Sequence, residues 1–244
     1  MPTLGSSTHS QILWSKIGLA EDRLTAASDR FWTHPDLAWM LPDFLVQLQC
    51  VMRSGLALMA TARDRACGLA GDPVADATAV YLDAHIREEK DHDEWLLHDI
   101  ESIGILPDEV LNATPGPAVV SLLGAQYFWL FHAHPVAIFG YLIVLEGYPP
   151  LAQQLDEIRI RTGFPESAFR CLKAHAEDDP GHIAMLNSTL DQMPLTGNQA
   201  KFIGLSALHT IDAVAAVFEQ LIENCKVSRN LSRQYGQFSQ NSHA

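Results

Sequence analysis

The chain has 244 residues, of which 48% are hydrophobic and 18% charged, and its formal net charge is −13. This composition suits a globular protein, and the excess of acidic residues argues against nucleic acid or an anionic membrane as a partner. The four cysteines form no C-x-x-C pair, which argues against a zinc ribbon or a disulfide scaffold and favours the cytoplasm. The first residues lack a basic segment followed by an apolar run, so we expect no secretory signal.

Helical periodicity dominates the chain and strand signals are weak, which predicts an all-α protein. The first three helices are expected at about residues 9–28, 43–69 and 74–103. Asp72 and Pro73 precede the third helix, and an aspartate cap followed by proline in the first turn is a typical helix start.

The second half of the chain continues this pattern, with a proline pair separating two groups of helices. The expected helices span about residues 116–132, 135–146, 151–161, 165–190 and 198–225.

No shift in composition marks a linker, so we expect residues 1–225 to form one domain. Residues 226–244 are polar and are expected to form a disordered tail. Residues 117–145 carry no formal charge, but Pro135 and its neighbours split them into apolar runs too short to cross a bilayer. No membrane partner is therefore expected.

Two helical segments repeat one spacing of histidines and acids. An α-helix turns about 100° per residue, so offsets of four and seven residues return to nearly the same face. Each segment therefore presents two imidazoles and a carboxylate together, which is a ligand set for iron, manganese or zinc. The two triplets are His85-x3-Glu89-x2-His92 and His175-x3-Asp179-x2-His182.

Glu146 is the only charged residue between Glu109 and Asp156, and it follows a run of apolar residues. An ionised carboxylate in such surroundings is costly unless it is paired or bound to a metal ion. The alternative is that Glu146 ends its helix and reaches solvent. The two triplets favour the metal interpretation.

Together these residues predict a dinuclear site built from three carboxylates and three imidazoles. Such a set can hold two divalent ions with a bridging carboxylate, and its oxygen and nitrogen donors favour Fe(II) or Mn(II). We expect Glu146 to bridge the ions and to be the catalytic ligand. Glu88 competes with Glu89 as the first carboxylate, and His85 is either an extra ligand or a supporting residue. The predicted ligands are Glu89, His92, Glu146, His175, Asp179 and His182.

Pro180 interrupts the second triplet. Proline lacks an N–H and its ring clashes with the carbonyl four residues earlier, so the helix is expected to kink or partly unwind there. Gly181 adds further freedom. We therefore expect this half of the site to be loose and to become ordered when metal and substrate bind.

The pattern E-x2-H, an isolated helical Glu and H-x3-D-x2-H resembles the haem-oxygenase-like di-iron oxidases and oxygenases. The resemblance covers about residues 40–225. It implies a single-domain, seven-helix bundle with the metal site between core helices, two Fe(II) ions as cofactor and O2 as co-substrate. Some members carry a carboxylate seven residues before the histidine of the first motif, where this chain has His85. The first-helix carboxylate is therefore the least defined ligand.

The resemblance also implies an O2-dependent enzyme of small-molecule, natural-product biosynthesis. The expected substrate is an amino acid or a similar compound, oxidised by N-oxygenation, by oxidative C–C or C–N cleavage, or to a nitrile. Aromatic residues near the uncharged segment are candidates for the substrate pocket, although such residues are more often core. The candidate substrate-binding residues are Tyr127, Phe131, His132 and Tyr141.

Three other functions stay open. A fatty-acid decarboxylase would share the fold and the metal site. A metal-free, thiaminase-like hydrolase would need a nucleophilic cysteine, and Cys171 lies four residues before His175. A ferritin-like iron protein would be expected to carry E-x2-H twice, which this chain does not. The expected partner is a small-molecule substrate, and a homodimer is an alternative to a monomer.

Overall fold

The computed structural model describes the backbone of residues 7–241 and side chains as far as residue 228. Every regular element in this range is a helix, as the sequence predicts. The first elements are α1 (His9–Gly18), α2 (Asp22–Trp32), α3 (Leu37–Cys67), α4 (Pro73–Glu88), α5 (His92–Glu101), α6 (Pro107–Leu111) and α7 (Pro117–His132). They are followed by the 3-10 turn η1 (Pro135–Ala137), α8 (Ile138–Glu146), α9 (Ala152–Thr162), η2 (Glu166–Phe169), α10 (Arg170–Gln192) and α11 (Gly197–Asn241).

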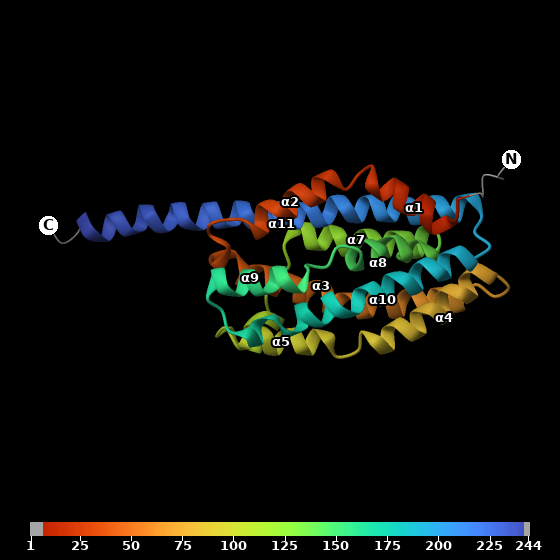
Figure 1. Cartoon of the computed structure of the whole chain (residues 1–244), viewed down its shortest axis with the longest axis horizontal. Coiled ribbons are helices and arrows are strands. Elements are labelled where there is room, and N and C mark those ends of the chain that lie inside the picture. The colour runs from red at the N-terminus through yellow and green to blue at the C-terminus, as the bar shows by residue number, and fades with distance from the viewer. Residues whose placement is uncertain (1–6, 242–244) are drawn as a thin grey trace.

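The long helices lie side by side along the longest axis of the molecule, and α11 runs the whole length of the bundle (Figure 1). Helix α11 packs against α2, α7 and α8, while α3 packs against α4, α5 and α7. One hydrophobic core, from Leu13 to Ile222, contains apolar side chains from all of these helices. Helix α3 and residues Gly197–Ser228 of α11 are long and apolar enough to cross a membrane, and their buried apolar side chains belong to this core.

Several helix boundaries differ from the sequence prediction. The eight expected helical segments become eleven α-helices in the described range, because two of these segments are each divided and the short α6 is added. The first predicted helix, 9–28, is divided into α1 and α2. The last, predicted to end near residue 225, continues to Asn241. The division into a domain of residues 1–225 and a disordered tail of 226–244 stays a prediction.

The break between α4 and α5 has the largest consequence for the site. The predicted helix 74–103 ends at Glu88 and restarts at His92, with Asp91 at φ +71°. Aspartate is among the few residues that adopt this left-handed conformation readily. Glu89 therefore caps α4 rather than lying in a helix interior. The start of this segment is as predicted, since Asp72 accepts hydrogen bonds from the N–H groups of Val74 and Ala75.

The predicted unwinding at Pro180 is wrong. Helix α10 is continuous from Arg170 to Gln192, with Pro180 in its interior and exposed. The helix packs against α1, α5, α8 and α9. Proline removes one hydrogen bond from a helix, and packing against neighbouring elements can hold such a helix together.

Gly140 determines how closely α8 approaches α11. A Cβ at this position would lie 2.2 Å from the carbonyl oxygen of Ile203 and 2.6 Å from the backbone nitrogen of Ala207. Only glycine therefore permits this helix contact. Because Glu146 is the last residue of α8, this close packing also places its carboxylate inside the bundle.

Candidate metal centre

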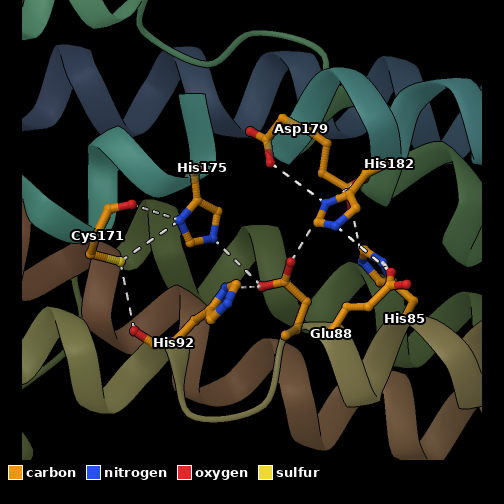
Figure 2. A network of polar contacts seen from close by, with 9 residues as sticks. His85, Glu88, His92, Cys171, His175, Asp179 and His182 are labelled. Atoms are coloured by element: carbon orange, nitrogen blue, oxygen red, sulfur yellow. Dashed lines mark hydrogen bonds and ion pairs between the residues drawn. The ribbon is translucent and has the colours of Figure 1, made fainter. Parts of the chain in front are cut away.

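Histidines and acids from four helices meet between α4, α5, α8 and α10 (Figure 2). Their ligand atoms form two groups, and within each group these atoms lie within 4.8 Å of one another. We call them the His182 cluster, which contains His85, Glu146 and His182, and the His175 cluster, which contains Glu89, His92 and His175. The structure thus brings together residues up to 97 positions apart in the sequence.

The His182 cluster is built on a contact between His85 and Glu146. Nε2 of His85 lies 2.9 Å from Oε1 of Glu146, and Nδ1 of His182 lies 4.0 Å from Oε2 of Glu146. His85 is 1% exposed and Glu146 is 9% exposed. The alternative that Glu146 extends from its helix end into solvent is therefore wrong.

The His175 cluster is formed across the break between α4 and α5. Oε2 of Glu89 lies 3.1 Å from Nδ1 of His92 and 3.5 Å from Nε2 of His175. Nδ1 of His175 lies 2.9 Å from the carbonyl oxygen of Cys171. Because a carbonyl can only accept, Nδ1 carries the proton and Nε2 faces Glu89.

Glu89 connects the two clusters. Its Oε1 lies 3.7 Å from Nδ1 of His182, while its Oε2 faces the His175 cluster. His175 and His182 are two helical turns apart on α10, so each belongs to a different cluster. Glu89 therefore lies between the two clusters, where Glu146 was expected as the bridging ligand. A bridging role for Glu146 stays a prediction.

Asp179 and Glu88 both lie at the edge of the metal centre, but Asp179 is buried and Glu88 is exposed. Asp179 is buried, with Oδ1 3.7 Å from Nδ1 of His182. The Glu88 side chain is 44% exposed, and its Oε2 lies 3.9 Å from His85 Nδ1 and 3.7 Å from His182 Nε2. Of the two neighbouring acids, Glu89 lies inside the centre and Glu88 at its rim.

The buried polar atoms of the centre fit metal ions. Among the described side chains, eight buried polar atoms lack a hydrogen-bond partner, and four of them belong here. A buried polar atom without a partner is costly, so four such atoms together fit a site that binds metal ions. The four atoms are His85 Nδ1, Glu146 Oε2, Asp179 Oδ1 and His182 Nδ1.

Burial and neighbouring charges shift the pKa values of the centre in opposite directions. Burial raises the pKa of Glu146 despite its contact with His85. Burial also acts to raise the pKa of Glu89, but the contacts with His175 and His92 outweigh it and hold that pKa far below its usual range. Asp179 raises the pKa of His182. The pKa of His175 is raised by Cys171 and Glu89, although burial acts to lower it.

A surface cavity of about 460 Å³ opens onto the centre between α4, α5 and α10. Its walls include one histidine from each cluster, so it reaches both halves of the centre. None of its lining residues is a lysine or an arginine, whereas two carry carboxylates. The lining residues are Glu88, His92, Asp178, Gly181, His182 and Met185.

The structure does not bring the predicted aromatic substrate residues together at this cavity. Phe131 is 51% exposed near the end of α7, where its ring lies 5.2 Å from the Arg65 guanidinium. His132 is exposed and contacts the ring of Phe128. Tyr141 is buried in the core, and Tyr127 is half-buried on α7. Tyr127, Phe131 and His132 differ in exposure around α7, and Tyr141 lies on α8, so aromatic spacing alone does not show which residues share a face.

Two residues contribute more to the centre than their sequence positions indicate. His85 is a full member of the His182 cluster, and it is separated from Glu89 and His92 because the helix breaks. Tyr81 stacks on the His85 ring at 5.4 Å, and its hydroxyl is buried without a partner. The offset of four residues between them was the available signal.

The all-helical bundle and its two adjoining histidine–carboxylate clusters place this chain in the class of helical proteins with a candidate dinuclear metal centre. A family model described as iron-containing redox enzyme matches residues 43–215, and the chain belongs to this family. The matched range includes every residue of both clusters.

Two solved structures show that the fold is haem-oxygenase-like. One is a domain of unknown function with a heme oxygenase-like fold from Shewanella denitrificans, 18% identical over 90% of this chain and 91% of that chain, with a TM-score of 0.69. The other is a TenA homolog from Pseudomonas syringae pv. tomato, 15% identical over 87% of this chain and 92% of that chain, with a TM-score of 0.67. At these identities the likeness concerns the fold alone. No protein with a curated function matches the chain.

Proposed function

We propose that this protein is an O2-dependent, non-haem di-iron oxidase or oxygenase of small-molecule biosynthesis. Its substrate is an amino acid or an amino-acid-like amine. The observation that carries the proposal is the set of four unpartnered buried polar atoms beside a carboxylate that faces two clusters. The family supports iron as the metal.

Seven side chains would hold the two ions. His85, Glu146 and His182 would hold one, with Asp179 beside them, and Glu89, His92 and His175 would hold the other. Imidazole nitrogens and carboxylate oxygens suit Fe(II), and bidentate carboxylates commonly connect paired metal ions. When bound, Fe(II) supplies the electrons with which O2 is activated.

The cavity indicates the chemical class of the substrate. Its volume lies in the range of small-molecule sites, and its charged rim residues, Glu88 and Asp178, are both acidic. An ammonium group would be attracted to this rim, whereas a ligand whose only charged group is a carboxylate would be repelled. Met185 offers an apolar wall. These features favour an amine-bearing substrate over the fatty acid of a decarboxylase.

Within this proposal, each rim residue has a defined role. Glu88 binds the ammonium group and orients the substrate chain along the cavity. Asp178 adds a second negative charge on the α10 side. His92 and His182 form the inner wall, so the bond to be oxidised lies next to both clusters.

The position of Cys171 argues against the thiaminase-like alternative. This cysteine is 1% exposed, and burial raises the pKa of its thiol. A nucleophilic cysteine needs a lowered pKa and access to substrate. Cys171 is also absent from the lining of the cavity. A cytoplasmic location and a monomer or homodimer remain part of the proposal.

The test is to load the metal-free protein anaerobically with Fe(II) and to count the bound ions. Oxygen consumption is then followed with free amino acids, with the same compounds N-acetylated, and with fatty acids. We expect two irons per chain, a transient visible absorption on exposure to O2, and turnover that needs the free amine. Turnover that survives removal of metal by EDTA would refute the proposal, and a preference for fatty acids would support the decarboxylase.

A further inference from the structure

Asp99 is a buried acid outside both clusters. It lies on α5, seven residues after His92, and is 1% exposed. Its Oδ1 accepts a hydrogen bond from Nε of Arg170 at 3.1 Å, and its Oδ2 accepts one from the backbone N–H of Cys171 at 2.7 Å. These donors belong to the first two residues of α10. Because the first N–H groups of a helix have no partner within it, Asp99 caps α10 from a neighbouring helix.

Cys171, which Asp99 caps, is hydrogen-bonded to the His175 cluster. The carbonyl oxygen of Cys171 accepts from Nδ1 of His175, which leaves Nε2 of that imidazole facing Glu89. The sulfur of Cys171 lies 3.6 Å from the carbonyl oxygen of His92. Asp99 thus connects the helix that carries His92 to the start of the helix that carries His175.

We propose that Asp99 is a positioning residue for the His175 half of the metal centre. It fixes the start of α10 against α5, and thereby fixes both the separation of His92 and His175 and the orientation of the His175 ring. The inference rests on the proposed metal centre. Replacing a residue that hydrogen-bonds a metal-binding histidine commonly changes metal affinity 10- to 100-fold, and Asp99 acts on His175 through the backbone of Cys171.

A general role in helix packing would act on both ions alike, whereas the network of Asp99 reaches one cluster only. None of its contacts involves His85, Glu146 or His182. The expected signature of a positioning role is therefore selective. One ion is bound more weakly and the other is bound as in the wild type.

The experiment uses Asp99→Asn in the full chain, titrated with Co(II), whose absorption reports each bound ion. Asparagine keeps the size of the side chain but offers only one strong acceptor to the two donors. We expect two ions in the wild type and, in the variant, one ion with unchanged affinity and a second weakened about 10- to 100-fold. Two ions bound with wild-type affinities would overturn the proposal.

Asp191→Asn is a matched control on the same helix. Asp191 accepts hydrogen bonds from the backbone N–H of Ser10 at 2.8 Å and from its hydroxyl at 3.0 Å, so it caps α1 from the far end of α10. We expect this variant to bind both ions normally. An equal loss of one ion in both variants would overturn the proposal, because it would show that any loosening of α10 has this effect.

Two further variants test the proposal if Asp99→Asn does not fold and separate the Cys171 side chain from its backbone contacts. If Asp99→Asn does not fold by circular dichroism, Arg170→Ala removes one of the two contacts from an exposed side chain and should weaken the same ion several-fold; no change there would overturn the proposal. Cys171→Ala keeps the backbone contacts and should bind both ions. A wild-type protein that binds no metal would instead refute the proposed function.

Discussion

Nε2 of His85 lies 2.9 Å from Oε1 of Glu146, so a histidine of α4 faces the last residue of α8 inside the bundle. The other ring nitrogen of His85 and the other carboxylate oxygen of Glu146 have no hydrogen-bond partner. Oε2 of Glu146 lies 4.0 Å from Nδ1 of His182, which also lacks a hydrogen-bond partner, so both of these atoms are available to a metal ion.

The first prediction concerns His85 as a ligand. His85→Ala should weaken one of two bound ions about 100-fold or more, because removing a ligand costs at least as much as removing its support. Equilibrium dialysis against Co(II) or Mn(II) measures this loss. His98→Ala is the control, since His98 is exposed on α5. Two tightly bound ions in His85→Ala would show that His85 is not a ligand.

Glu146→Gln should change stability in opposite directions with and without metal. In metal-free protein the substitution removes a buried carboxylate that has one unpartnered oxygen, so we expect a gain of about 1 kcal/mol. The stabilisation that saturating Mn(II) gives to the wild type, about 2.7 kcal/mol at a hundred times Kd, should be largely lost.

Thermal unfolding in EDTA and in Mn(II) measures both effects. Glu157→Gln on the exposed face of α9 is the control and should change neither. An equal metal-induced rise in Tm for Glu146→Gln and the wild type would contradict the assigned role of Glu146.

Metal binding should release protons. The contacts with Cys171 and Glu89 raise the pKa of His175, and Asp179 raises the pKa of His182, so both imidazoles hold protons at pH values where a free histidine is mostly neutral. A metal ion must displace these protons, and the apparent affinity should therefore rise as pH rises and fall as pH falls.

Calorimetric titration in buffers of different ionisation enthalpy counts the released protons. Mn(II) binding near pH 7 should release at least one proton per chain, and His182→Gln should release fewer. If the enthalpy of binding does not depend on the buffer, the predicted protonation of the metal-free centre is incorrect.

Glu88 and Glu89 should have separable roles although they are neighbours. Glu89→Gln should weaken both ions, because its oxygens face both clusters. Glu88→Gln should keep both ions and raise KM for an amine substrate about fivefold, the size expected for a partly exposed charge pair. Metal content and steady-state kinetics separate the two. Loss of metal in Glu88→Gln would instead assign Glu88 as a ligand.

Pro180→Ala tests whether the His182 side of α10 is held under strain in the metal-free protein. Alanine restores an N–H donor and removes the ring clash, so the metal-free variant should be more stable by about 1–3 kcal/mol. Denaturant unfolding in EDTA measures this gain. No gain would show that the surrounding helices already accommodate the proline at no cost, and that this half of the centre is not loosely held.

The sequence by itself determined the class of the protein and most of its candidate ligands. The spacing of His175, Asp179 and His182 fixes their shared face, because backbone geometry alone sets the periodicity of a helix. The uncharged run before Glu146 indicated burial, because an isolated charge is excluded from apolar surroundings unless it is bound. Both inferences concern local properties, and both agree with the described structure.

Only the tertiary structure decided how these residues are divided into two clusters. The break at Asp91 separates His85 from His92, and the packing of α8 on α11 determines that Glu146 meets His85. The same packing places Phe131 on the surface and Asp99 beneath the start of α10. These positions depend on the register between helices that are distant in sequence. Side-chain packing in three dimensions sets this register, and it leaves no periodic signal in the chain.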